Sequence, residues 1–193
     1  MFRFLVSPIM LFLGACASAS AFVSRSTPAA NEKFGLYAYG ENVGGLSLFY
    51  ANGLAYIGDP ANSTSSTASS VSFKRSSDSS STWIANPNST TKAEAGWSDE
   101  LLYVPSSSSS NHQMGFTSSR RSNETTTGFI FYGQWVMVEL ESGDMSSSFY
   151  VRRESEGKGV YSLLWNVTDE ETAIPVFPAF CQALQRMRQS LLS

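Results

Sequence analysis

Two glutamates near the end of a predicted strand have the residue type and the spacing for acid–base catalysis. Glu139 and Glu141 are two residues apart, so on a strand they share one face, with Cα atoms about 6.6 Å apart. Trp135 and Met137 precede them on the same face. Glycosidases use two carboxyl groups about 5–9 Å apart, one as the acid and the other as nucleophile or base. One hypothesis is therefore a carboxylate-based glycoside hydrolase that acts on cell-wall polysaccharide.

A simpler interpretation of this pair is that the strand leaves the core and its last charges meet water. Glu141 directly precedes the turn sequence Ser142-Gly143-Asp144, where solvent-facing charge is ordinary. We therefore favour a non-catalytic protein and keep the hydrolase as the alternative.

Histidine and cysteine are too scarce for most other catalytic or metal sites. The single histidine, His112, follows a run of five serines, where we expect an exposed loop rather than the rigid frame of a catalytic triad. One histidine and one mature cysteine, Cys181, cannot supply the three or four ligands of a zinc or copper site. We predict no metal and no cofactor. Cys181 is either a buried apolar side chain or half of an intermolecular disulfide.

Aromatic side chains offer a second kind of site, because flat rings bind the apolar C–H faces of sugars. A secreted domain without internal disulfides needs most of its large aromatic residues for the core. Trp97 stands between a glycine and a polar run, outside any predicted strand. It is therefore our candidate for a surface aromatic residue that binds a ligand.

The N-terminus predicts export from the cell. A positive start, an apolar run over 4–14 and small residues up to Ala21 are typical of a secretory signal peptide, cleaved after residue 21. An alternative is a bacterial lipobox over 13–16, in which Cys16 would be acylated. Four glycosylation sequons favour a secreted eukaryotic glycoprotein; they begin at Asn62, Asn88, Asn123 and Asn166.

Charge and hydropathy restrict the partners. The net charge is −3, and the chain has no basic stripe, so we expect no nucleic acid partner. No apolar stretch after residue 21 reaches the roughly 20 residues that a membrane-spanning helix needs. The expected partners are cell-wall polysaccharide or a protein on a host surface, and the oligomeric state is left open.

Apolar runs separated by turn residues predict an all-β fold of about ten short strands, an antiparallel, jelly-roll-like β-sandwich. The firmest element is a hairpin in which Asn52-Gly53 forms a type I′ turn and Phe49 faces Tyr56. Residues 129–140 are interpreted as one long strand with a bulge or a bend at Gly133. Residues 149–153 return antiparallel to it, and another strand follows over 160–167.

The domain organisation follows from these patterns. We expect a signal peptide over 1–21, a linker over 22–33, the β-sandwich domain over 34–173 and a partly helical segment over 174–193. The helix is predicted because Phe180, Leu184, Met187 and Leu191 recur at helical spacing, with Pro178 placed to begin it.

Several segments resemble a group of small secreted proteins of filamentous ascomycete fungi. They are Gly-Leu-Tyr-Ala-Tyr-Gly (35–40), Gly-Gly-Leu (44–46), Leu-Phe-Tyr-Ala-Asn-Gly (48–53), Ala-Tyr-Ile-Gly-Asp (55–59) and Gly-Val-Tyr-Ser-Leu-Leu-Trp-Asn (159–166). The resemblance implies an extracellular fungal protein, and it assigns no activity and no catalytic residues. In that group the last strand is followed by another extended segment, from which the predicted helix departs. Together these observations predict a secreted, non-catalytic protein with a binding or effector-like role at a cell wall or host surface.

Overall fold

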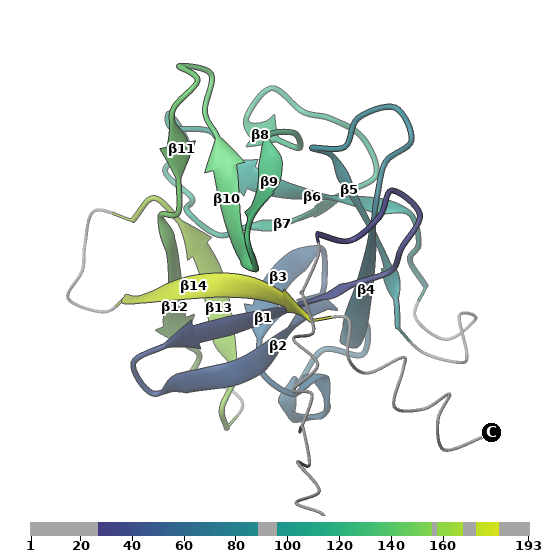
Figure 1. Ribbon diagram of the computed structural model, residues 1–193. Helices are drawn as coiled ribbons and strands as arrows, with labels where there is room; N and C mark the ends of the chain where they lie inside the picture. Colours follow the sequence, from purple (N-terminus) through teal and green to yellow (C-terminus); the bar gives the residue numbers. More distant parts are fainter. Residues whose placement is uncertain (1–26, 89–95, 156–157, 168–172, 182–193) are drawn as a thin grey trace, which may run out of the picture.

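A computed structural model describes residues 27–88, 96–155, 158–167 and 173–181 (Figure 1). Its first strands are β1 (Gly35–Gly40), β2 (Val43–Ala51), β3 (Leu54–Ile57), β4 (Ser69–Arg75), β5 (Trp83–Pro87), β6 (Glu100–Pro105) and β7 (Gly115–Thr117). The others are β8 (Glu124–Thr125), β9 (Phe129–Tyr132), β10 (Trp135–Glu139), β11 (Met145–Ser146), β12 (Phe149–Arg153), β13 (Tyr161–Trp165) and β14 (Ile174–Cys181). A 3₁₀ turn, η1 (Pro60–Asn62), is the one helical element in the described residues. The all-β prediction is confirmed.

Ten of these strands form a closed antiparallel barrel, so the predicted sandwich is wrong. The order around the barrel is β1-β2-β4-β5-β6-β7-β3-β13-β12-β14, and β14 pairs with β1 to close it. Figure 1 shows β1 and β14 lying side by side. β10 joins the edge of β14, β9 and β11 flank β10, and β8 pairs with β6. Alternating short strands suit a sandwich and a barrel equally, because the two differ only in which edges pair.

The hairpin of β2 and β3 has the predicted turn and register. Asn52 and Gly53 have φ angles of 52° and 80°, as a type I′ turn requires. Phe49 is paired with Tyr56, and their rings stack with centroids 5.5 Å apart. A local signal in the sequence therefore fixed this element correctly.

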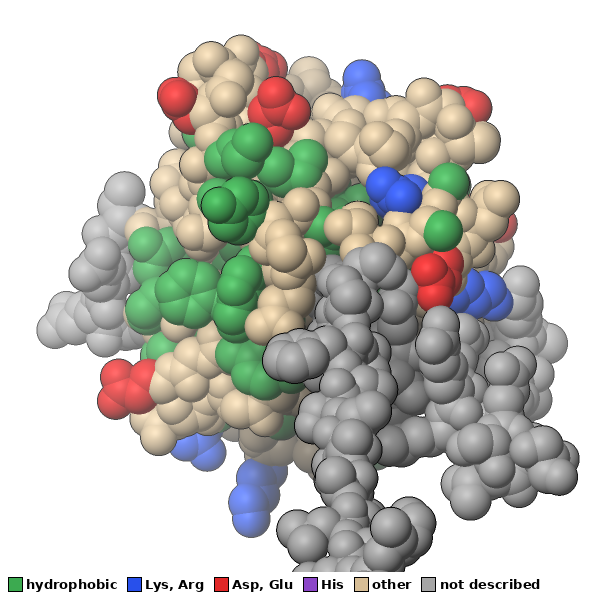
Figure 2. Space-filling model, viewed as in Figure 1, with side chains coloured by type: hydrophobic (Ala, Val, Ile, Leu, Met, Phe, Trp, Pro, Cys, Tyr) green, Lys and Arg blue, Asp and Glu red, His purple; other side chains and the backbone are tan. Residues whose placement is uncertain are grey.

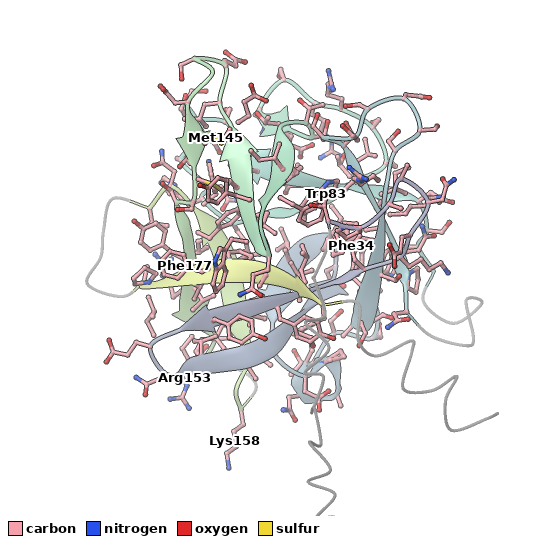
Figure 3. All side chains as sticks on the ribbon, in the orientation of Figure 1. Phe34, Trp83, Met145, Arg153, Lys158 and Phe177 are labelled. Atoms are coloured by element: carbon pink, nitrogen blue, oxygen red, sulfur yellow. The ribbon has the colours of Figure 1, made fainter. Side chains whose placement is uncertain are left out.

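The barrel core is built from large aromatic side chains. Trp83 has no exposed surface, and it stacks on Phe129 and Phe131 and meets the edge of Phe34. Figure 3 shows Trp83 and Phe34 close together inside the fold. On β5 the side chains alternate between buried and half-buried, as period-2 patterning requires. This packing agrees with the expectation that most of the large aromatic residues fill the core.

Residues 129–140 form a tight hairpin rather than one bent strand. Gly133, with φ of 62°, and Gln134 make a two-residue turn that places Tyr132 opposite Trp135. A glycine at the first turn position is typical of a type II′ hairpin. The predicted return strand is also corrected, because β12 pairs with β13 and β14, while the short β11 pairs with β10.

Residues 174–181 form a strand rather than the beginning of a helix. β14 pairs with β1, β12 and β10, so the barrel continues past the predicted domain boundary at residue 173. Pro178 lies within this strand and is buried, instead of beginning a helix. Residues 174–181 pair with other strands along both of their edges. The stability of that pairing exceeds the local preference for a helix that the apolar spacing indicated. The remaining residues of the predicted helix, from 182 onward, lie outside the described residues.

Candidate functional site

Five large apolar side chains gather on the outer surface of the barrel, and we call them the aromatic patch. They are Tyr39, Tyr132, Trp135, Met145 and Phe177, with exposed fractions between 39% for Trp135 and 68% for Tyr132. Figure 2 shows hydrophobic side chains gathered on this face, over β9, β10, β11 and β14. A contiguous exposed apolar surface of this kind marks an interaction site more often than a stray surface residue does.

Strand pairing brings these residues together from distant parts of the sequence. Tyr39 of β1 is paired with Phe177 of β14, and Trp135 of β10 is paired with Tyr132 across the hairpin turn. Trp135 also pairs with Ala179 of β14, which joins the two halves of the patch. Because side chains alternate along each strand, Trp135 is exposed while its neighbour Val136 is buried.

The rings of the patch are inclined to one another. Trp135 meets Tyr39 at a centroid distance of 6.4 Å and an interplanar angle of 85°. It meets Phe177 at 6.0 Å and 66°. Edge-to-face contacts of this kind are favourable between aromatic rings, so they hold the exposed side chains in place. Trp135 therefore joins Tyr39 and Phe177 in one cluster of inclined rings within the patch.

A cleft with a volume of about 740 Å³ and a mixed polar and apolar lining lies at the end of β10. Its walls come from the serine loop over 106–108, the β10–β11 turn, Ser146 and Asn166, and buried Val104, Val138 and Trp165 also line it. This volume falls within the range of about 300–1,000 Å³ that is usual for small-ligand sites. Hydroxyl, amide and carboxyl groups around an apolar base suit a saccharide, which has both hydroxyl groups and apolar faces.

Both candidate glutamates line this cleft. Glu139 is the last residue of β10, and Glu141 lies in the turn that follows, so the two do not share a strand face as predicted. Both are exposed. Glu139 is paired with Met145 of the aromatic patch, which makes the cleft and the patch neighbours on the same strands. The structure thus places the two glutamates along the wall of a concave site next to the aromatic patch.

Trp97 is not the surface residue that the sequence predicted. It lies outside the strands as expected, but its exposed fraction is only 9%. Its ring stacks on Tyr50 at 4.1 Å and packs against Phe116. The exposed tryptophan is instead Trp135, whose outward direction was implied by the alternation with Val136 and Val138. Tyr132 and Phe177 were missed because their strand pairing is not visible in the sequence.

His112 is half-buried rather than fully exposed. Its Nδ1 lies 3.1 Å from the carbonyl oxygen of Trp165, and its own carbonyl accepts the Trp165 N–H at 2.8 Å. These contacts hold the end of β13 in place, so we assign His112 a structural role. In the described residues no three His, Cys, Asp or Glu side chains are grouped so that they could hold a metal ion. The absence of a metal or cofactor in function stays a prediction.

The four sequon asparagines are all exposed. The Asn62 side chain donates to the carbonyl of Lys158, and Asn166 lines the cleft. Whether any of them carries a glycan stays a prediction, and the side chain of Cys181 lies outside the described ones.

Within the described residues, no helix has the length and apolar character needed to cross a membrane.

A separate group of titratable side chains lies on β2 and β6. Burial raises the pKa of Glu100, and the charge of Arg121 partly opposes this. Burial, followed by the charge of Glu100, also raises the pKa of the Tyr50 hydroxyl. These residues do not line the cleft, so we assign their effect to stability.

The raised pKa of Glu100 gives a testable pH dependence. The folded state favours the protonated form of the Glu100 carboxyl group. The stability gained in this way is present in full below the pKa that Glu100 has in the unfolded state. It is lost as pH rises through the folded pKa. Between pH 4 and pH 7, we expect the melting temperature of Glu100→Gln to fall by less than that of the wild type. Parallel thermal unfolding of the two proteins measures this, and identical pH profiles would contradict it.

No family model, curated protein or solved structure matches the chain. The resemblance to secreted fungal proteins is therefore untested by these comparisons, and the site is interpreted from its own geometry.

Proposed function

We propose that this protein is a non-catalytic extracellular protein that binds cell-wall polysaccharide through the aromatic patch. The observation that carries the proposal is the gathering of Tyr39, Tyr132, Trp135 and Phe177 on one exposed face. Leaving these side chains in water is unfavourable, at about 25 cal/mol for each Å² of apolar surface. Covering them with a ligand recovers that free energy.

The chemistry of the surroundings supports a saccharide as the ligand. Sugar rings have apolar C–H faces that pack on aromatic rings, and hydroxyl groups that need hydrogen-bonding partners. The patch offers the rings for the apolar faces, and the exposed Tyr39 and Tyr132 also offer hydroxyl groups for hydrogen bonds.

The experiment is a pull-down on insoluble chitin, β-glucan and cellulose. We expect the wild-type protein to bind at least one of them, and Trp135→Ala to bind at least tenfold more weakly, which corresponds to about 1.4 kcal/mol. Trp135→Phe keeps an aromatic ring at the same position and should retain most of the binding. Circular dichroism of each variant checks that the barrel is intact.

Two results would contradict this proposal. Wild-type protein that binds none of the three polysaccharides, but binds a protein on host cells, would place the patch in a protein interface. Equal polysaccharide binding by the wild type and Trp135→Ala would show that the patch is not the site.

The alternative function is a glycoside hydrolase, and the cleft that holds both Glu139 and Glu141 favours it. In that case one carboxyl group protonates the glycosidic oxygen, and the other acts as nucleophile or base. A reducing-sugar assay on the same polysaccharides separates the two functions. Sugar release by the wild type that is lost in Glu139→Gln would replace the binding proposal by the hydrolase.

A further inference from the structure

We infer that Asn166 carries an N-linked glycan whose first sugars lie in the cleft at the end of β10, so that the protein's own glycan is the ligand of this cleft. The inference rests on the extracellular part of the proposed function, because N-glycosylation takes place during export. It does not depend on the aromatic patch. It assigns the cleft a covalently attached saccharide instead of a polysaccharide substrate.

The position of Asn166 is fixed by its backbone. Its N–H donates to the carbonyl of Ser148 at 2.9 Å. The preceding residue, Trp165, contacts His112 through two backbone groups: its N–H donates to the His112 carbonyl, and its carbonyl oxygen lies 3.1 Å from Nδ1 of His112. Asn166 has a left-handed φ of 51°, a conformation that asparagine adopts more readily than most residues. The side chain therefore leaves the chain at a defined point on the cleft wall.

The side-chain amide of Asn166 is available for modification. Asn166 is exposed, and among the described residues no hydrogen bond engages its amide. Asn62 differs, since its Nδ2 donates to the carbonyl of Lys158 at 3.0 Å. Of the four sequon asparagines, Asn166 is the one that lines the cleft. A glycan attached there begins inside a concave site rather than on an open surface.

The lining of the cleft matches the first sugars of such a glycan. The lining holds two glutamates, Glu139 and Glu141, and four serines, Ser106, Ser108, Ser142 and Ser146. Each serine hydroxyl already makes one hydrogen bond to a neighbouring side chain, and its oxygen can accept a further one. Leu140, which also lines the cleft and is 41% exposed, supplies an apolar surface for a C–H face. Attachment removes most of the entropy of bringing the sugar to its site, so weak contacts suffice to hold it there.

The attachment step uses a lipid-linked oligosaccharide diphosphate as co-substrate. A bond forms between Nδ2 of Asn166 and the anomeric carbon of the oligosaccharide. The bond between that carbon and the donor diphosphate breaks, and the diphosphate leaves with the electron pair. The amide nitrogen loses one proton. No oxidation or reduction takes place.

The test uses the full chain secreted from a eukaryotic host. Glycopeptide mass spectrometry first measures occupancy at each sequon. A glycan-releasing amidase is then applied to the native protein, and release is followed separately at Asn166 and at the other occupied sequons, with Asn123 as the reference. We expect Asn166 to be occupied and its glycan to be released at least tenfold more slowly. After denaturation the rates should be equal.

A variant of the cleft distinguishes a glycan that is bound by the cleft from one that is released slowly only because its attachment site is sterically crowded. Glu139→Ala combined with Glu141→Ala leaves the attachment site unchanged and removes two polar partners, so we expect release at Asn166 to approach the reference rate. An unmodified Asn166, or equal native release at Asn166 and Asn123, would overturn the inference. The polysaccharide pull-down with Trp135→Ala gives a separate answer, so a failure of the proposed function is distinguishable from a failure here.

Discussion

Replacing Trp83 by alanine is expected to destabilise the protein by about 3–5 kcal/mol, the cost usual for emptying a buried aromatic site. Trp83 is fully buried and contacts Phe34, Phe129 and Phe131, which come from different parts of the barrel. For a domain of this size the loss corresponds to a melting temperature lower by roughly 10 °C. Thermal or urea unfolding monitored by tryptophan fluorescence measures it.

Trp135→Ala is the matched control for this prediction, because it removes the same side chain from the surface. Trp135 keeps edge-to-face contacts with Tyr39 and Phe177, so we expect a smaller loss of about 1–2 kcal/mol. The two variants should thus differ in their main effect: Trp83→Ala chiefly lowers the stability of the fold, and Trp135→Ala chiefly weakens ligand binding. Equal losses of stability would show that Trp83 is not central to the core.

Gly128→Ala is expected to have the second large effect, a loss of roughly 3–4 kcal/mol from backbone strain and overpacking together. Gly128 has a φ of 87°, and an added Cβ would lie 2.5 Å from the carbonyl oxygen of Glu139. The Glu139 N–H in turn donates to the Gly128 carbonyl at 2.8 Å. The new methyl group must therefore displace the end of β10, and with it one wall of the cleft.

A comparison with Gly143→Ala separates the cost of backbone strain from the cost of the steric clash. Gly143 has a similar φ of 85°, but an added Cβ there meets nothing within 4 Å. We expect a loss of about 1–2 kcal/mol from the left-handed backbone alone. Urea unfolding of both variants gives the difference, and a Gly143→Ala variant as unstable as Gly128→Ala would refute the steric argument.

Local signals in the sequence were sufficient where neighbouring residues decide the structure. Asn52-Gly53 predicted the turn of the β2–β3 hairpin and the pairing of Phe49 with Tyr56, because a two-residue loop fixes the register. Gly133 carried an equally local signal, but a glycine between two apolar runs suits a bend and a two-residue hairpin turn alike. Only the observed pairing of Tyr132 with Trp135 distinguishes them.

The candidate site depended on contacts between strands far apart in the sequence. The residue types of Glu139 and Glu141 identified one wall of the cleft, while Asn166 and the serine loop join it only through the fold. Trp97 was mistaken for a surface residue because a polar run surrounds it, although its ring is covered by Tyr50. Exposure of a single aromatic residue depends on tertiary packing, which composition does not determine.

The closure of the barrel by β1 and β14 has a consequence for how the protein folds during its synthesis. β1 begins at Gly35, yet its partner residues, 176–181, are among the last of the described chain to be made. Until then one edge of β1 has no partner, and an unpaired edge invites association with other chains. Such long-range pairing is also slow to form. A nascent chain in which β14 has not yet been made should therefore depend on chaperones to protect the open edge of β1.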